Sequence, residues 1–269
     1  MIPLDYLVLR VIRRHLPDRV VRVLLQRRIV IKPGLETTAP DEAAQRFLDA
    51  LRAAGERLDG RRVLLFGYGG GFGVGLALLR AGAGHVVLLD PYAIPDNRTP
   101  AGDNSPYLSR SGTELRPNPK WLTVVRAPVR QYLADGGQPL DLVFSNSVLE
   151  HVDDLAGVVP DLARVTAPDG QHFHFVDMRD HFFKYPFEML CHSEKVWRRL
   201  LNPGSNLNRL RTRDYRRLFS ASFARVTIEP LASDLGAFQA ARPRIRPEFL
   251  TGDDVQDAVT RIFLRASQA

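Results

Sequence analysis

The sequence is poor in cysteine and in long apolar runs. Its 269 residues include one cysteine, Cys191, which excludes an internal disulfide framework and fits a reducing compartment such as the cytoplasm. No stretch reaches the roughly 18 uninterrupted apolar residues of a transmembrane helix. The first residues show no small-residue cleavage site behind a clean apolar region, so we expect no signal peptide. These absences favour a soluble cytoplasmic protein.

Acidic residues are scarce near the N-terminus. Residues 1–32 hold two of them, Asp5 and Asp18, against eight Lys or Arg, and this segment carries most of the net charge of +7. A second basic segment, 195–217, holds eight Lys or Arg against Asp214. Such asymmetry suits an anionic membrane surface, nucleic acid or a phosphorylated ligand, or it forms a solvated arginine-rich face.

Apolar side chains recur at helical spacing near the N-terminus and then in short runs typical of buried strands. Helical spacing covers 4–12, and 40–60 is typical of a helix with Pro40 in its first turn and Gly60 at its end. Beyond this helix, strand-like runs alternate with helical ones. Strands are expected at 62–67, 85–90, 121–127, 140–147, 171–178, 223–231 and 260–267, and helices at 74–83 and 153–170.

This alternation predicts an α/β fold with a doubly wound, Rossmann-like sheet of seven strands, mostly parallel. The connection between the last two strands is too short for a deep crossover, so the last strand is expected to be antiparallel. Residues 91–120 are rich in Pro, Asn and Ser and predict no regular structure. We expect a basic helical N-terminal extension or lid (1–39) and one domain (40–269), in which 178–220 is an aromatic and basic lid insertion.

Six glycines fall within FGYGGGFGVG, from Phe66 to Gly75, directly after the first buried strand. In a doubly wound sheet, ligands bind at the carboxyl ends of the strands, so this turn is a candidate nucleotide site. The G-x-G-x-x-G fingerprint of dinucleotide sites fits in no register, and no Gly-Lys-Ser/Thr follows as in a phosphate-binding P-loop. The spacing that fits is G-x-G-x-G, at Gly67, Gly69 and Gly71.

This glycine motif resembles the first motif of the class I S-adenosylmethionine-dependent methyltransferases, in the branch that acts on small molecules. Asp90 ends the second strand, where that family carries an acid that binds both ribose hydroxyls. The stretch LDLVFSNSVLEHV, 140–152, looks like the fourth-strand motif of the family. The stretch LARVTAPDGQHFHFVD, 162–177, looks like the helix and strand that follow. The resemblance covers about residues 40–269 and includes the reversed final strand.

The resemblance implies a site for S-adenosylmethionine at the carboxyl ends of the strands. The family usually has an acid two residues before the first glycine, near the cofactor ammonium, and often one near the adenine. Here Leu65 and the pair Arg126–Ala127 stand at those positions, and we expect Glu36 to take the first role. The expected cofactor contacts are Gly67, Tyr68, Gly69, Gly71, Asp90, Pro91, Arg126, Ala127, Ser145, Asn146 and Glu36.

Candidate catalytic residues follow the fourth and fifth strands, at the end where the cofactor methyl group is expected. An imidazole titrates near neutral pH, and a carboxylate beside a histidine can orient it as a base. Such groups either take a proton from a hydroxyl acceptor or only cap and structure the local turns. The candidates are His151, Asp177, Asp180 and His181.

We therefore expect methyl transfer to a small-molecule or glycan acceptor, at oxygen rather than nitrogen. No metal is expected, because His172 and His174 share a strand face without further ligands. The basic segments leave open an RNA methyltransferase, although no base-amine motif and no RNA-binding module accompany them, so nucleic acid is not the expected partner. The missing acids leave open a non-catalytic member that binds a nucleoside or a partner protein. Residues 1–32 are a candidate peripheral contact with the inner membrane surface.

Overall fold

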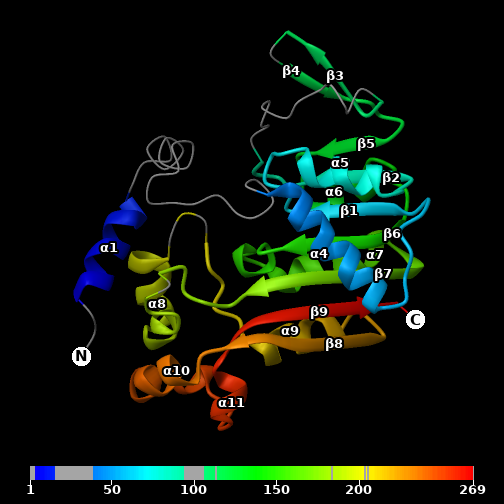
Figure 1. The fold of residues 1–269 in the computed structure, drawn as a ribbon. Coiled ribbons are helices and arrows are strands. Elements are labelled where there is room, and N and C mark those ends of the chain that lie inside the picture. Colours follow the sequence, from blue (N-terminus) through cyan, green and yellow to red (C-terminus); the bar gives the residue numbers. More distant parts are fainter. Residues whose placement is uncertain are drawn as a thin grey trace.

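The computed structural model describes residues 4–15, 39–93, 106–112, 114–182, 184–202, 204 and 206–268. Its main feature is a seven-stranded sheet in the order β5-β2-β1-β6-β7-β9-β8 (Figure 1). Strands β5, β2, β1, β6 and β7 run parallel, and β9 is antiparallel to both of its neighbours. The predicted α/β sheet with a reversed last strand is confirmed. The reversed strand lies inside the sheet, and β8 forms the edge.

The strands and helices have the following bounds. The sheet consists of β1 (Arg62–Phe66), β2 (His85–Leu89), β5 (Leu122–Val125), β6 (Leu140–Asn146), β7 (Thr166–Asp177), β8 (Arg225–Ser233) and β9 (Val259–Ser267). The helices are α1 (Leu4–His15), α4 (Pro40–Ala53), α5 (Gly73–Arg80), α6 (Val129–Ala134), η2 (Leu149–His151), α7 (Leu155–Val165), η3 (Glu188–Cys191), α8 (Glu194–Val196), η4 (Trp197–Leu201), α9 (Thr212–Ser220), α10 (Leu235–Ala241), η5 (Arg242–Arg244), η6 (Pro247–Phe249) and α11 (Asp254–Asp257).

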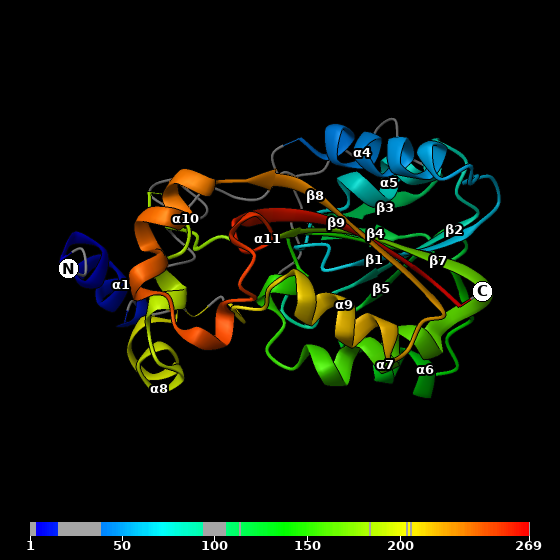
Figure 2. The ribbon, with the colours of Figure 1, turned by 90° about the horizontal axis from the view of Figure 1, so that it is seen from below.

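Helices cover both faces of the sheet (Figure 2). Successive residues of a strand point to opposite faces, so Leu65 and Leu64 of β1 belong to different apolar clusters. Leu65 packs with Phe47 of α4 on one face, and Leu64 packs with Val159 of α7 on the other. Because both faces are buried, the parallel strands show the continuous apolar runs seen in the sequence.

Residues 106–117 differ from the sequence-based expectation. Instead of irregular structure they contain an antiparallel hairpin of β3 (Leu108–Ser111) and β4 (Glu114–Pro117). The expectation was wrong because two leucines among the polar residues, Leu108 and Leu115, bury their side chains in the cluster on the α4 face. Burial of these two side chains fixes the hairpin against the sheet.

The helix expected to reach Gly170 is shorter than predicted. It ends at Val165, and β7 begins at Thr166, which pairs with Leu140 of β6. Pro168 disfavours helical backbone at the residue before it, so the chain leaves the helix early. Strand β7 is therefore five residues longer at its start than the predicted strand from 171.

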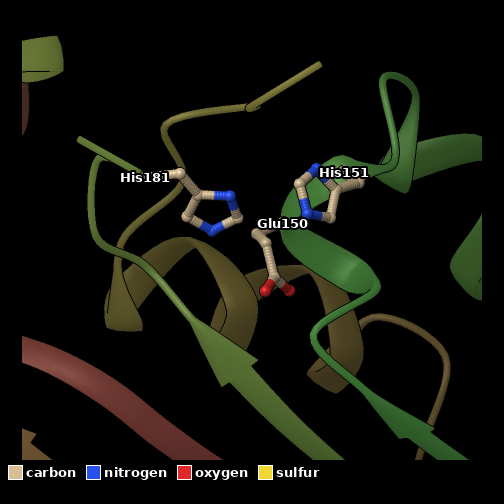
Figure 3. A group of neighbouring side chains, drawn as sticks. All are labelled: Glu150, His151 and His181. Carbon is tan, nitrogen blue, oxygen red and sulfur yellow. The ribbon is translucent and has the colours of Figure 1, made fainter. Parts of the chain in front are cut away.

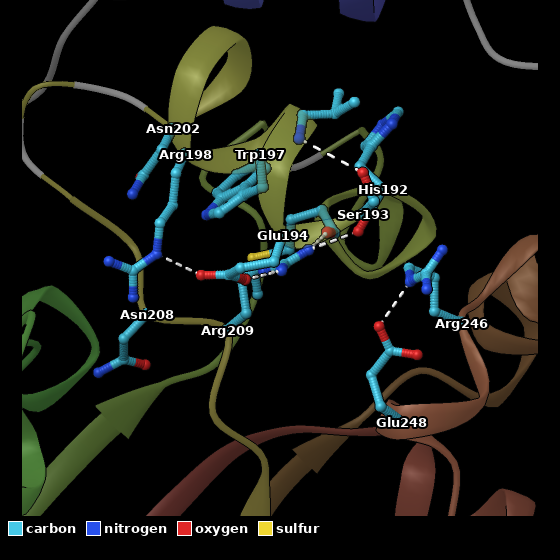
Figure 4. A network of polar contacts seen from close by, with 12 residues as sticks. His192, Ser193, Glu194, Trp197, Arg198, Asn202, Asn208, Arg209, Arg246 and Glu248 are labelled. Atoms are coloured by element: carbon cyan, nitrogen blue, oxygen red, sulfur yellow. Dashed lines mark hydrogen bonds and ion pairs between the residues drawn. The ribbon is translucent and has the colours of Figure 1, made fainter.

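The insertion 178–220 contains short helices with a small apolar core of their own, shared with α10. Arg209 is buried there and has φ of 61°. Its guanidinium donates to the carbonyl oxygens of Met189 (3.0 Å) and His192 (2.7 Å) and pairs with Glu194 (Figure 4). A charged group thus fixes the path of the insertion by bonding its backbone.

Helix α1 packs against this insertion, beyond the carboxyl ends of the parallel strands (Figure 1). Tyr6 and Arg10 on its inner face are fully buried. The Tyr6 hydroxyl donates to Asp180 (2.5 Å), and Arg10 forms an ion pair with Asp180. The Arg10 guanidinium also lies 5.2 Å from the Trp197 ring centroid. Residues 16–38 of the expected N-terminal extension lie outside the described residues. Among the helices that the structure describes, none combines the length and hydrophobicity of a membrane span.

Candidate functional site

The glycine turn follows β1 at the carboxyl edge of the sheet. Gly67, Gly69 and Gly70 have φ of 78°, 67° and 94°. Residues that carry a Cβ rarely adopt such positive φ angles. At Gly67 an added Cβ would lie 2.4 Å from Val148, which precedes η2. Glycine at 67 is therefore required both by the backbone conformation and by close packing. Gly69 of the turn is exposed.

Asp90 stands beside this turn, at the end of β2. Its carboxylate accepts the backbone N–H groups of Gly69 (3.2 Å) and Tyr92 (2.8 Å). The carboxylate is thereby fixed between the first two strand ends, where the sequence places the ribose of the cofactor. Pro91 follows in the same exposed turn. The structure thus brings the glycine turn and Asp90 into direct contact.

Other expected cofactor residues gather at the same edge. Burial raises the pKa of the Tyr68 hydroxyl, and the nearby Arg126 guanidinium opposes that shift. Arg126 and Ala127 line a cavity of about 480 Å³ beside β5. Leu65 is buried in the apolar cluster beneath α4, so it offers no polar contact. Glu36, expected to meet the cofactor ammonium, lies outside the described residues.

Two residues at the end of β6 have different surroundings. The Asn146 side chain is buried, and its Oδ1 accepts a hydrogen bond from Arg46 of α4 (2.8 Å). Arg46 also stacks over the Phe175 ring, 3.6 Å from its centroid. Sequence reasoning missed Arg46, which is one of two arginines on the amphipathic helix α4. Ser145 is fully buried and its hydroxyl contacts His174 (2.7 Å).

Three side chains meet where β6 and β7 end: Glu150, His151 and His181 (Figure 3). The two imidazole centroids are 5.0 Å apart, and one metal-ligating atom from each of the three residues lies within 4.8 Å of the others. Glu150 is buried, and its Oε1 accepts the Asp177 N–H (3.3 Å). The structure therefore brings together the two predicted histidines. Sequence reasoning missed Glu150, for which the only signal is an acid next to His151.

An asparagine loop orients His151. Nδ1 of His151 lies 2.7 Å from the Asn206 carbonyl oxygen, and the Asn206 amide donates back to the His151 carbonyl (3.1 Å). The Asn208 amide donates to the Leu149 carbonyl (2.7 Å), and the Asn208 N–H donates to the Glu150 carbonyl (2.9 Å). A carbonyl oxygen can only accept, so Nδ1 of His151 carries the proton. In the neutral ring Nε2 is then a proton acceptor.

The turn around His151 also holds unusual backbone conformations. Ser147 and Asn206 have φ of 52° and 53°, which costs free energy at residues other than glycine. Ser147 follows β6 directly, and its N–H donates to the Phe175 carbonyl of β7 (2.8 Å). The end of β6 is thus held in one geometry by its neighbours. Such a held geometry suits a site that must place a side chain accurately.

The two predicted carboxylates have separate partners. Asp177 binds Arg179 through both carboxylate oxygens, at 2.9 Å and 2.5 Å. Burial alone would raise the pKa of Asp177, but Arg179 and the nearby His181 together lower it. Asp180 is fully buried beneath α1, where Tyr6 and Arg10 hold it. Asp177 therefore lies with the histidines, and Asp180 anchors α1.

We expect Asp180→Ala to loosen α1, because it removes the carboxylate of a fully buried ion pair with Arg10. Hydrogen exchange of the α1 amides should become at least about tenfold faster. The control is Asp5→Ala on the same helix, which breaks an exposed pair with Lys184 that is worth little. Equal exchange in the two variants would show that the buried pair does not anchor the helix.

Comparisons with known proteins match this geometry. The family described as "Methyltransferase domain" matches residues 39–222. The chain is similar in fold to a candidate sarcosine dimethylglycine methyltransferase from Galdieria sulphuraria, with 15% identity, a TM-score of 0.51, and coverage of 85% of this chain and 86% of that one. It is also similar to a geranyl diphosphate methyltransferase in complex with S-adenosylmethionine, with 14% identity, a TM-score of 0.51 and coverage of 85% of each chain. A search of the curated proteins finds no match.

Proposed function

Because the chain belongs to the methyltransferase-domain family, we propose that it transfers a methyl group from S-adenosylmethionine to a hydroxyl of a small-molecule or glycan acceptor. The class I fold and the enzyme class follow from the family and the sheet order. One observation carries the proposal further. The glycine turn with Asp90 and the histidine pair with Glu150 lie at the same edge of the sheet, joined by the contact of Gly67 with Val148.

The cofactor end is assigned from the residues around the glycine turn. We assign the ribose hydroxyls to Asp90, the amino-acid part to the backbone of Gly67, Tyr68, Gly69 and Gly71, and the adenine side to Pro91, Arg126 and Ala127, which follow β2 and β5. We assign Asn146, which accepts a hydrogen bond from Arg46, to the side of the cofactor site nearest α4. When bound, S-adenosylmethionine supplies a methyl group already activated by its sulfonium.

The acceptor end is assigned to His151 and His181. Methyl transfer forms a bond between the acceptor oxygen and the methyl carbon as the carbon–sulfur bond breaks, and its electron pair returns to sulfur. The proton of the acceptor hydroxyl then needs a base. We assign this role to Nε2 of His151, which carries the lone pair of the neutral ring because Nδ1 donates to Asn206. Asp177 and Glu150 balance the positive charge that develops on the histidine pair.

We expect His151→Phe to lower kcat by about a hundredfold or more, because general-base catalysis contributes on that scale. The affinity for S-adenosylmethionine, measured by calorimetry, should stay unchanged. The matched control is His85→Phe, whose ring bonds the Lys120 carbonyl at the opposite ends of the strands. Unchanged kcat in His151→Phe with a hydroxyl acceptor would remove the base assignment.

The same three side chains could instead hold a divalent cation, since two imidazoles and a carboxylate are a common ligand set. Dialysis against a chelator distinguishes the two roles. With a base at His151 the activity persists, whereas a loss restored by Zn²⁺ would assign a metal site.

An RNA acceptor is tested in parallel, because log affinity for RNA should fall steeply with log salt.

A further inference from the structure

The outer face of α1 is apolar, which is unusual for a helix at the surface. Leu4, Val8, Val11 and Ile12 recur at spacings of three and four residues, so they share one face. Their exposed fractions lie between 39% and 74%. The inner face carries the fully buried Arg10. The apolar side of α1, which an ordinary amphipathic helix would bury, therefore faces the solvent.

Exposed apolar side chains are concentrated in this part of the molecule. Among the described residues, eleven large apolar side chains are exposed, and seven of these belong to α1 or to the adjoining α8 and η4. Concentrations of this kind mark contacts with another surface. The seven are Leu4, Val8, Leu9, Val11, Ile12, Val196 and Leu200.

Basic side chains surround these apolar residues. Arg14 of α1 and Lys195, Arg198 and Arg199 of α8 and η4 are all exposed. Of the acidic groups nearby, Asp5 pairs with Lys184, and Asp153 and Asp154 line a cavity together with Arg198. Glu194 pairs with Arg198 and with the buried Arg209 (Figure 4). An apolar face with a basic rim is complementary to an anionic bilayer, whose acyl region and head groups match the two parts.

The same elements are tied to the acceptor end of the site. Asp180 holds Tyr6 and Arg10 of α1, and the next residue along the chain is His181. We infer that α1, α8 and η4 rest on an anionic lipid surface and that the acceptor is borne by a lipid and presented there. This inference rests on the proposed function for its acceptor, while the surface itself can be tested alone.

The test is sedimentation of the full chain with phosphatidylcholine vesicles, with and without phosphatidylglycerol. We expect binding to the anionic vesicles and weakening by salt. Val8→Glu/Ile12→Glu should lower the vesicle partition coefficient by about a hundredfold or more, because two side chains would no longer enter the bilayer. The control is Val255→Glu on α11, where the valine is even more exposed than Val8 and Ile12, and this variant should bind as the parent does.

Several outcomes would overturn the inference. Equal pelleting of Val8→Glu/Ile12→Glu and the parent is one, and equal binding to neutral and anionic vesicles is another. A dimer in light scattering that the double variant dissociates would assign the surface to a second copy of the chain. Calorimetry with S-adenosylmethionine on the same proteins separates the two proposals. If neither the parent nor the variants bind S-adenosylmethionine, the proposed function is contradicted, whereas the conclusion about vesicle binding still stands.

Discussion

Asp90→Ala is expected to weaken binding of S-adenosylmethionine by about a hundredfold to ten-thousandfold. In the proposed complex the carboxylate accepts both ribose hydroxyls, and each hydrogen bond to a charged group contributes about 1.5–3 kcal/mol. The substitution also releases the N–H groups of Gly69 and Tyr92, so the glycine turn loses part of its support. Isothermal titration calorimetry with S-adenosylmethionine and S-adenosylhomocysteine measures the loss.

Asp59→Ala is the matched control for this prediction. Asp59 is an exposed aspartate that pairs with Arg57 ahead of β1, away from the carboxyl edge, and its loss should leave the affinity unchanged. Asp90→Asn should fall between the two, since it keeps an acceptor oxygen and loses the charge. If Asp90→Ala binds as the parent does, the ribose assignment is wrong.

Acid is expected to destabilise the fold steeply, because two histidines of β7 are buried and neutral. Burial lowers the pKa of His174 to about 3 and holds the pKa of His172 well below its ordinary value of 6.5. The unfolded chain therefore binds protons first. The stabilisation from the two neutral histidines is complete above about pH 6.5. As the pH falls below this value, the free energy of unfolding decreases by about 2.7 kcal/mol per pH unit for the two groups together.

Hydrogen bonds show why neither ring accepts a second proton. The Thr166 hydroxyl donates to the Leu162 carbonyl (2.6 Å), so its oxygen accepts from Nε2 of His172 (2.7 Å). Nδ1 of His172 then accepts from Nε2 of His174 (3.1 Å), and Nδ1 of His174 accepts from the Ser145 hydroxyl (2.7 Å). Each ring carries one proton, at Nε2. A further proton on Nδ1 of His172 would place two donors against each other, and one on Nδ1 of His174 would require the Ser145 hydroxyl to turn and accept instead of donating.

Two measurements check the acid prediction. Urea unfolding between pH 7.5 and 4.5 should show the free energy falling with a slope of about two protons. Nitrogen NMR of the folded protein at pH 5.5 should find both imidazoles neutral and protonated at Nε2. The half-buried His85 ring is not part of this chain of bonds. Titration of His172 and His174 near pH 6.5 in the folded state would contradict the prediction.

The sheet could be predicted from the sequence because its strands are buried on both faces. A continuous apolar run between a charged residue and a glycine turn, such as VLLF in β1, is typical of a strand that is buried on both faces. The hairpin β3–β4 could not be predicted in this way. Its burial depends on Leu108 and Leu115 reaching a cluster built by distant helices, and no local periodicity encodes that contact.

The candidate site also contains residues whose placement could be predicted from the sequence and residues whose placement could not. The glycine turn and Asp90 lie next to strand ends, so their meeting follows from the sheet order. The orientation of His151 depends on Asn206, far along the chain in an irregular loop. Asp180 is a polar residue near a strand end in the sequence, and only the packing of α1 shows that its carboxylate is fully buried.

The contact between Gly67 and Val148 links the two halves of the site. Any side chain at position 67 would push Val148, and η2 with His151 begins at the next residue. We expect binding of the methyl donor and of the acceptor to be coupled through this contact. Such coupling is reciprocal. The bound acceptor therefore raises the affinity for the cofactor by the same factor by which the bound cofactor raises the affinity for the acceptor.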